Sequence, residues 1–248
     1  MLIPTRNRPV ELATVLAGLA AQQDQDFTVL VSDQSDADPS YATPAAQAMT
    51  RRLRLTGHPV VLTRHLPRRG LAEHRQFLLD SADADRVLFL DDDVWLAPDV
   101  LRRLGSALTE LRCGFVGNAM QGLSFMEDER PDEQLPYREW DGPVEPEETT
   151  GSDRWTLHNA ANLIHLADRL NLRPGEWRAY HVAWIAGCVL FDRPKLLDCG
   201  GFDFWTELPA EHAGEDVAAQ RRVLERYGGA GILPSGAVHL ESPTTVPD

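Results

Sequence analysis

The sequence is poor in cysteine and in basic residues, and it has no long apolar run. Its three cysteines, Cys113, Cys188 and Cys199, are widely spaced and form no CxxC pair. This pattern argues against a disulfide framework or a structural zinc site, and it suits buried thiols in a reducing compartment. No stretch approaches the roughly 20 apolar residues of a membrane span, and no signal-peptide core stands at the N-terminus. We therefore expect a cytoplasmic protein without a transmembrane segment.

Lysine and arginine together number 24, against 38 aspartates and glutamates, so the formal net charge is -14. Proteins that grip nucleic acid independently of sequence do so largely by neutralising phosphates with basic side chains. We therefore expect no nucleic-acid partner. The net charge does not exclude a local basic pocket.

The first half of the chain alternates short strand patterns with helical ones. Strands are expected over 2–4, 27–32, 60–62 and 86–90, and helices over 9–23, 41–55 and 71–81. This alternation predicts an α/β fold with parallel βαβ units, and the 248 residues suit one domain. Ligands of such folds bind beyond the carboxyl ends of the strands.

The second half is less regular. The stretch 121–178 is acidic, rich in proline and contains three scattered tryptophans, with one helical pattern over 157–170. We interpret it as an insertion or lid, because it has too little periodic apolar content for a core of its own. Regular patterns return as a strand over 183–191, helices over 194–197 and 215–227, and a last strand over 231–238.

The segment "VLFLDDDVWLAPD" places Asp91, Asp92 and Asp93 directly after a buried strand. Adjacent carboxylates repel one another, and partial burial worsens this unless a cation or hydrogen-bond donors compensate. A divalent metal, Mg²⁺ or Mn²⁺, held by these oxygens against a diphosphate would provide the compensation. The alternative is an exposed turn whose aspartate caps a helix that begins near Pro98.

Six segments taken in order carry a resemblance. "IPTRNRP", "VLVSDQSDAD", "GLAEHRQFLL" and "VLFLDDDVWLAPDVL" resemble the nucleotide-binding half of family 2 glycosyltransferases with the GT-A fold. "AGCVLFDRPKLLDCGGFD" and "GEDVAAQRRVLERYG" resemble the acceptor half of that family. The resemblance implies one domain over 1–248, with a Rossmann-like nucleotide-binding half (1–120), the insertion (121–178) and an acceptor-binding half (179–248) around a mixed sheet.

The resemblance also implies an activity. This is metal-dependent, inverting transfer of one sugar from a nucleoside diphosphate sugar, typically a UDP-sugar, to a glycan, lipid-linked or small-molecule acceptor. Mn²⁺ or Mg²⁺ would be the cofactor, and a homo-oligomer is left open. The implied roles are as follows: nucleotide-sugar binding by Pro4, Thr5, Arg8, Asp33, Arg75, Asp91 and Asp92; metal binding by Asp93, Asp91 and His239; catalysis by Asp216 as general base with Glu215; acceptor binding by Gly187, Cys188 and Trp184.

Six of these residues also have a plain structural interpretation. Arg8 and Arg75 would be solvated charges, Asp33 a turn-forming residue after a strand, and His239 a structural histidine. Glu215 and Asp216 would favour the dipole at a helix start.

Two other classes of protein stay open. A sugar-phosphate nucleotidyltransferase has a similar nucleotide-binding topology, but "PTRNRP" lacks the glycine-rich phosphate loop that it requires. A catalytically silent nucleotide- or glycan-binding module is the non-enzyme alternative. "QRRVL" at 220–224 is not the Q-x-x-R-W motif of processive polymerases, so single addition is implied.

Overall fold

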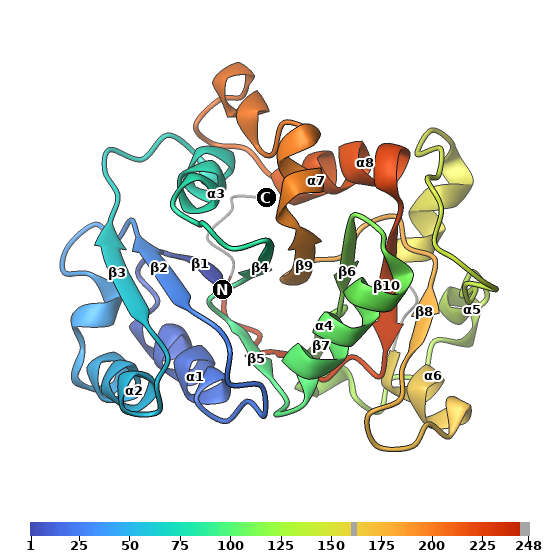
Figure 1. Ribbon diagram of the computed structural model, residues 1–248, viewed down its shortest axis with the longest axis horizontal. Helices are drawn as coiled ribbons and strands as arrows, with labels where there is room; N and C mark the ends of the chain where they lie inside the picture. The colour runs from blue at the N-terminus through green and yellow to red at the C-terminus, as the bar shows by residue number, and fades with distance from the viewer. Residues whose placement is uncertain (160–162, 244–248) are drawn as a thin grey trace.

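The computed structural model describes residues 1–159 and 163–243 (Figure 1). Over these residues, the strands form an eight-stranded sheet in the order β3-β2-β1-β4-β9-β6-β10-β8. β1 to β4 are mutually parallel, whereas β9 runs antiparallel to both β4 and β6. The strands of this sheet are β1 (Leu2–Thr5), β2 (Val29–Asp33), β3 (Val60–Arg64), β4 (Arg86–Leu90), β6 (Phe115–Gly117), β8 (Arg178–Tyr180), β9 (Cys188–Asp192) and β10 (Gly229–Leu233).

A second, three-stranded sheet joins segments that lie far apart in the sequence. Its order is β5-β11-β7, where β5 is Val94–Leu96, β7 is Gln121–Gly122 and β11 is Ala237–His239. β5 begins directly after the aspartate triplet, and β11 ends at His239. This small sheet therefore brings His239 beside the triplet.

The helices cover both faces of the large sheet. The buried apolar side chains form two clusters. Cluster one contains side chains of α1, α2 and α4, and cluster two contains side chains of α3, α6, α7 and α8. Figure 1 shows α1 and α2 below the strands, and α3, α7 and α8 above them. The helices are α1 (Pro9–Leu19), α2 (Pro44–Leu55), α3 (Leu71–Asp80), α4 (Val100–Leu111), α5 (Pro131–Gln134), α6 (Leu163–Leu170), α7 (Arg193–Asp198) and α8 (Glu215–Tyr227), with 3₁₀ turns η1 (Ser40–Ala42), η2 (Leu123–Phe125), η3 (Ser152–Asn159) and η4 (Asp203–Glu207).

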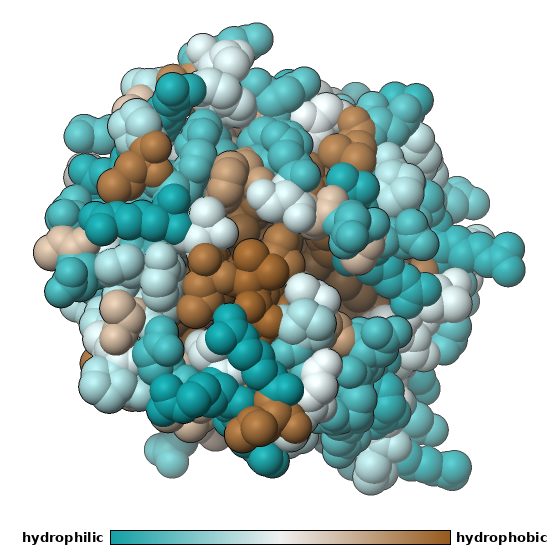
Figure 2. Space-filling view, turned by 60° about the vertical axis from the view of Figure 1, so that its left-hand side comes forward, coloured by the Kyte–Doolittle hydropathy of each residue, from teal (hydrophilic) through white to brown (hydrophobic). Residues whose placement is uncertain are grey.

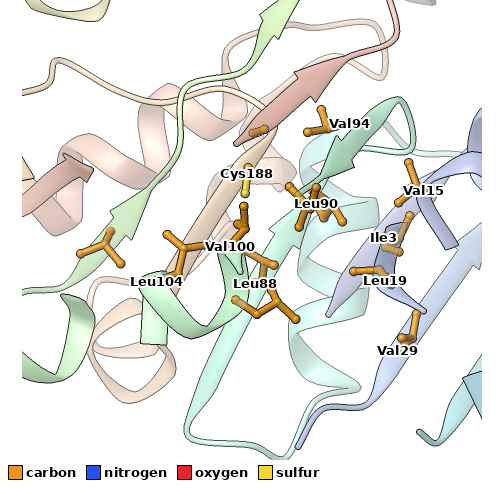
Figure 3. Close-up of a cluster of buried hydrophobic side chains, with 14 of the residues drawn as sticks. Ile3, Val15, Leu19, Val29, Leu88, Leu90, Val94, Val100, Leu104 and Cys188 are labelled. Carbon is orange, nitrogen blue, oxygen red and sulfur yellow. The ribbon is translucent and has the colours of Figure 1, made fainter. Parts of the chain in front are cut away.

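Residues of the central strands alternate between the two core clusters. Leu88, Leu90 and Cys188 belong to cluster one (Figure 3), whereas Phe89 and Val189 belong to cluster two. The side-chain period of a strand is two, so a strand buried on both faces reads as a continuous apolar run. This explains why "VLFL" enters the core without polar interruption. On the face drawn in Figure 2, the surface is mostly hydrophilic, and hydrophobic residues gather in a hollow near its centre.

Three expected elements differ from the structure. The helix expected over 157–170 is the 3₁₀ turn η3 followed by α6, and residues 160–162 lie outside the described part of the chain. The strand expected over 183–191 begins only at Cys188, because the backbone of Ile185 exchanges hydrogen bonds with the Gln220 side chain (2.8 Å each). The strand expected over 231–238 is split into β10 and β11. Pro234 between them has no amide to donate, and Gly236 has a φ of +69°.

The expected insertion, 121–178, packs against the second half of the sheet. Leu163 and Leu166 of α6 are buried in cluster two. Glu147 is bonded to Arg154 and His181, each at 2.9 Å, and the Trp140 ring stacks on His181 with centroids 3.7 Å apart. The segment is therefore held by apolar packing, by the contact of Glu147 with His181 and by the stacking of Trp140 on His181.

Among the described residues, no helix is long and apolar enough to cross a bilayer.

Candidate active site

A cavity of about 650 Å³ opens at the carboxyl ends of β1, β2 and β4. Its size falls in the range of small-molecule binding sites. Strand ends, the start of α3, the loop before α8 and the segment after β11 all contribute to its wall. The lining residues are Pro4, Thr5, Arg6, Arg8, Gln34, Arg68, Gly70, Leu71, His74, Arg75, Asp91, Asp92, Asp93, Met120, Ala210, Glu211, His212, His239 and Ser242.

Asp92 and Asp93 are buried in the cavity wall, and cationic or donor groups surround them. Arg8 Nη1 lies 3.0 Å from Asp92 Oδ1 and 2.6 Å from Asp93 Oδ2. Thr5 Oγ1 donates to Asp92 Oδ2 at 2.7 Å. His239 Nε2 lies 3.4 Å from Asp93 Oδ2. The repulsion expected from the triplet is therefore relieved by an arginine, a hydroxyl and an imidazole.

The two carboxyls differ in their acidity. Burial raises the pKa of Asp92 to about 6, although Thr5 and Arg8 act in the opposite direction. Burial also acts to raise the pKa of Asp93, but the hydrogen bond with His239 and the charge of Arg8 outweigh it and lower that pKa. The contact with Asp93 in turn raises the pKa of His239, against the effect of its burial. Asp93 is thus the more acidic carboxyl of the pair.

Asp91 faces a different partner. Arg75 on α3 is 5% exposed, and it donates from Nη2 to Asp91 Oδ1 and from Nε to Glu215 Oε1, both at 2.9 Å. Burial would lower the pKa of Arg75, but the charges of Asp91 and Glu215 raise it. Arg75 therefore ties the end of β4 to the start of α8, and it holds Asp91 and Glu215 as ion-pair partners.

Asp216 follows Glu215 in the first turn of α8 and lies in a small pocket beside the main cavity. Arg75 borders both spaces, and Gly187, Cys188 and Gln220 line the small one. Burial, together with the charge of Glu215, raises the pKa of Asp216 to about 7. A carboxyl that takes up and releases protons near neutral pH is suited to general-base chemistry.

Gly187 and Cys188 are packed where β9 begins. Gly187 has a φ of +73°, and a Cβ there would lie 2.9 Å from Met120 Sδ and 3.0 Å from Val94 Cγ2. Its carbonyl accepts the Asp91 amide at 2.9 Å, and Cys188 is fully buried. These small residues give room to neighbouring protein atoms at this position. Trp184 lines a separate shallow pocket with Trp155, and neither residue borders the main cavity.

The sequence-predicted residues thus fall into two sets. Eight of them line the main cavity: Pro4, Thr5, Arg8, Arg75, Asp91, Asp92, Asp93 and His239. Six do not: Asp33, Gly187, Cys188, Trp184, Glu215 and Asp216.

Asp33 has a structural position. It is completely buried, and its carboxylate accepts the amides of Ser35 and Ser40 at 2.7 Å each. This arrangement builds the loop after β2 and matches the turn-forming alternative.

Of the cavity residues that the sequence analysis did not single out, Gln34 and His74 are the two that are buried. Gln34, one position after Asp33, is 5% exposed, and its Nε2 has no hydrogen-bond partner among residues 1–159 and 163–243. His74 is 3% exposed, pairs through Nε2 with Ser32 Oγ at 2.8 Å, and is neutral because burial lowers its pKa to about 3. The sequence signal for Gln34 was its place at a strand's carboxyl end. The signal for His74 was its place one residue before Arg75.

The loop before α8 reaches the cavity through His212. This side chain accepts the Ala72 amide at 3.1 Å on Nε2, and its Nδ1 donates to the Pro209 carbonyl at 2.7 Å. Gly70, with a φ of +109°, permits this approach, since a Cβ there would lie 2.5 Å from His212 Cε1. The loop is therefore pinned to the first turn of α3.

The donor set suits a divalent cation that is completed by substrate oxygens. Within the described residues, no group of three or more His, Cys, Asp and Glu side chains is placed to hold a metal ion. Asp93 and His239 do form an adjacent pair on the cavity wall. Mg²⁺ sites that bind nucleotides commonly use one or two carboxylates together with phosphates and waters. A two-donor site therefore fits a metal that arrives with a diphosphate.

The family model described as "Glycosyl transferase family 2" matches residues 1–163. The chain belongs to this family. The large sheet with its antiparallel β9 also matches GT-A glycosyltransferase structures, which confirms the predicted fold class. No curated protein sequence matches the chain.

Solved structures of the same fold are distant in sequence. Staphylococcus aureus TarS 1–349 is 15% identical with a TM-score of 0.61, over 96% of this chain and 58% of that one. TarS 1–349 in complex with UDP-GlcNAc is 14% identical with a TM-score of 0.59, over 98% and 58%. The mannosyltransferase PcManGT from Pyrobaculum calidifontis, in complex with GDP-Man and Mn²⁺, is 17% identical with a TM-score of 0.59, over 98% and 57%. The present chain thus spans less than two thirds of these structures.

Proposed function

We propose that this protein transfers a sugar from a nucleoside diphosphate sugar to an acceptor hydroxyl, with inversion at the anomeric carbon. The proposal rests on one arrangement. Asp92, Asp93 and His239 lie together in the wall of the main cavity, and Arg75 lines both this cavity and the pocket of Asp216. Family membership supports it, as do the UDP-GlcNAc and GDP-Man complexes of structures with the same fold.

The donor half of the site is the main cavity. Thr5, Gln34 and His74 offer neutral polar groups for the base and ribose, while Arg6, Arg8 and Arg68 offer positive charge for the phosphates. Asp93 and His239 would hold Mn²⁺ or Mg²⁺, which when bound neutralises the charge that develops on the departing nucleoside diphosphate. Asp91 acts indirectly, because its ion pair with Arg75 positions the guanidinium at the boundary of the two pockets.

The acceptor half is the region around Asp216. A carboxylate at this position removes the proton from the acceptor hydroxyl as the oxygen attacks, and direct displacement then inverts the configuration. Glu215 keeps Arg75 in place, so its role is positioning. None of the described residues of this segment, 121–159 and 163–178, lines the main cavity. Arg154 and Trp155 share the shallow pocket with Trp184 and Val217, the residue after Asp216. We assign 121–178 and Trp184 to the acceptor side on this ground.

The donor nucleotide and the metal are tested together. Turnover of UDP- and GDP-sugars is measured with Mn²⁺ and with EDTA, and the anomeric configuration of the product is read by NMR. We expect turnover only with metal, an inverted product, and loss of both turnover and nucleotide binding in Asp93→Ala. The matched control is Asp83→Ala, which changes an exposed aspartate outside the cavity.

Other outcomes identify the other classes. Release of pyrophosphate from a nucleoside triphosphate and a sugar phosphate would indicate a nucleotidyltransferase. Nucleotide binding without any turnover would indicate a silent binding module. Transfer that is unchanged in EDTA would remove the metal from the proposal.

The free cysteines Cys113, Cys188 and Cys199 support a reducing, cytoplasmic setting.

A further inference from the structure

Arg8 is the only residue that contacts two carboxylates of the triplet and the C-terminal segment at once within the described chain. Its Nη1 is shared by Asp92 Oδ1 (3.0 Å) and Asp93 Oδ2 (2.6 Å), and its Nη2 donates to the Pro243 carbonyl at 2.5 Å. The Arg8 side chain is 15% exposed, and those of Asp92 and Asp93 are 8% and 7% exposed. The contact is therefore an enclosed ion pair of one cation with two anions.

Such an enclosed pair of carboxylates needs a positive charge. Removing the cation from two adjacent buried anions leaves their mutual repulsion and their desolvation uncompensated. The other guanidinium near the triplet, that of Arg75, is engaged by Asp91 and Glu215. Arg8 therefore supplies the permanent positive charge at Asp92 and Asp93 whenever no metal is bound there, beside the titratable imidazole of His239.

The same oxygen serves both possible cations. Asp93 Oδ2 receives Arg8 Nη1, and it is also the oxygen that lies 3.4 Å from His239 Nε2. A divalent ion held by Asp93 and His239 would compete for the carboxylate oxygen that Arg8 contacts. A guanidinium within hydrogen-bond distance of that oxygen would then be pressed against a doubly charged ion, and like charges at this separation repel strongly inside a protein.

We propose that Arg8 is a resident counter-cation that competes with the divalent metal for Asp93. In the nucleotide-free protein, Arg8 holds the site closed to the metal alone. When a nucleoside diphosphate brings its own negative charge, the metal takes Asp93 and the guanidinium is released to the phosphates. This last step rests on the proposed function, whereas the competition itself does not.

The experiment measures binding of Mn²⁺ alone, by calorimetry and by loss of the free-ion EPR signal, with no nucleotide present. Arg8→Ala should bind Mn²⁺ at least about tenfold more tightly than the wild type, because the competing charge is gone. Arg8→Lys keeps the charge and should behave like the wild type. Arg6→Ala is the matched control, since Arg6 lines the same cavity but pairs with the exposed Asp36.

Thermal unfolding gives a second measurement that does not depend on activity. In EDTA, Arg8→Ala should melt below the wild type, and Mn²⁺ should raise its melting temperature far more than that of the wild type. Arg8→Gln provides the same test if the alanine variant does not fold. Equal Mn²⁺ affinity in wild type and Arg8→Ala, or no Mn²⁺ binding by either, would overturn the proposal.

Failure of the proposed function looks different. If the protein shows the expected Mn²⁺ behaviour but neither binds UDP or GDP nor turns over their sugars, the competition is supported and the proposed transferase function is refuted. If the protein turns over a nucleotide sugar but wild type and Arg8→Ala bind Mn²⁺ equally, the transferase function is supported and the competition is refuted.

Discussion

Replacing Asp216 with asparagine should stabilise the fold while it strongly reduces transfer. Burial and the charge of Glu215 raise the pKa of Asp216 from 3.8 to about 7. A carboxyl whose pKa is higher in the folded than in the unfolded state opposes folding once it would ionise, because the unfolded chain binds fewer protons. The cost is absent below about pH 4, grows as the pH rises to about 7 and is constant above that.

The size of the effect follows from the two pKa values. They differ by about three pH units, and each unit corresponds to about 1.4 kcal/mol. The ionised carboxyl therefore costs at most about 4 kcal/mol at pH 8, and the solvent contact that Asp216 retains reduces this figure. Asparagine has a similar shape and no charge, so Asp216→Asn removes the cost. For a chain of this length, each kcal/mol gained raises the melting temperature by about 2–4 °C.

Melting temperatures of wild type and Asp216→Asn are compared by circular dichroism from pH 4.5 to 8, beside transfer and UDP affinity at pH 7.5. The advantage of the variant should grow across this range. Transfer should fall by roughly 10²-fold or more with little change in UDP affinity, because a general base acts in the transition state. Asp168→Asn, at an exposed position, should show no pH-dependent advantage.

If Asp216→Asn raises the melting temperature equally at pH 4.5 and pH 8, the raised pKa of Asp216 in the folded protein is refuted. Near-normal transfer by Asp216→Asn would remove it as the base, and an inactive but folded Glu215→Gln would then transfer that role to Glu215.

Three further measurements test other parts of the site. Gln34→Ala should weaken UDP or GDP binding about tenfold in calorimetry, through loss of a buried hydrogen bond to the nucleotide; unchanged affinity would remove Gln34 from the contact. Gly70→Ala should lower the free energy of unfolding in urea by about 1–3 kcal/mol, because its φ is +109° and its Cβ would meet His212; no loss would show that the loop is not packed there. Hydrogen exchange should show little protection of 121–178 by UDP alone, and strong protection would move that segment to the donor side.

The elements that the sequence predicts well are those whose pattern is local. β1 to β4 and the helices between them were predicted within a few residues, because each carries its own apolar period. β5, β7 and β8 contain only two or three residues, β11 was expected only as the end of a longer strand over 231–238, and each of the four is stabilised by a partner far along the chain. No periodicity can register in so short a run. Tertiary pairing alone defines these strands, and with them the position of His239.

The site shows the same division. Charged residues at strand ends and at the start of α8 were identifiable, and the structure brings most of them to one cavity and its neighbouring pocket. Which cation meets which anion was not predictable, since Arg8 and Arg75 divide the triplet between them through side-chain geometry. Asp33 and Gln34 are adjacent in the sequence, yet the period of a strand and the turn after it send one to the loop backbone and the other to the cavity wall.

The small sheet that carries His239 has a consequence for how the protein is made. The cavity wall contains residues from Pro4 to Ser242, so all of this segment must leave the ribosome before the site is complete. At synthesis rates of about 5–20 residues per second, His239 emerges roughly 7–30 s after Asp93. During that interval the triplet lacks the His239 imidazole, and β5 lacks β11, the strand with which it pairs. A chain arrested before β11 would therefore leave the backbone of β5 unpaired, and unpaired strand edges are prone to aggregation.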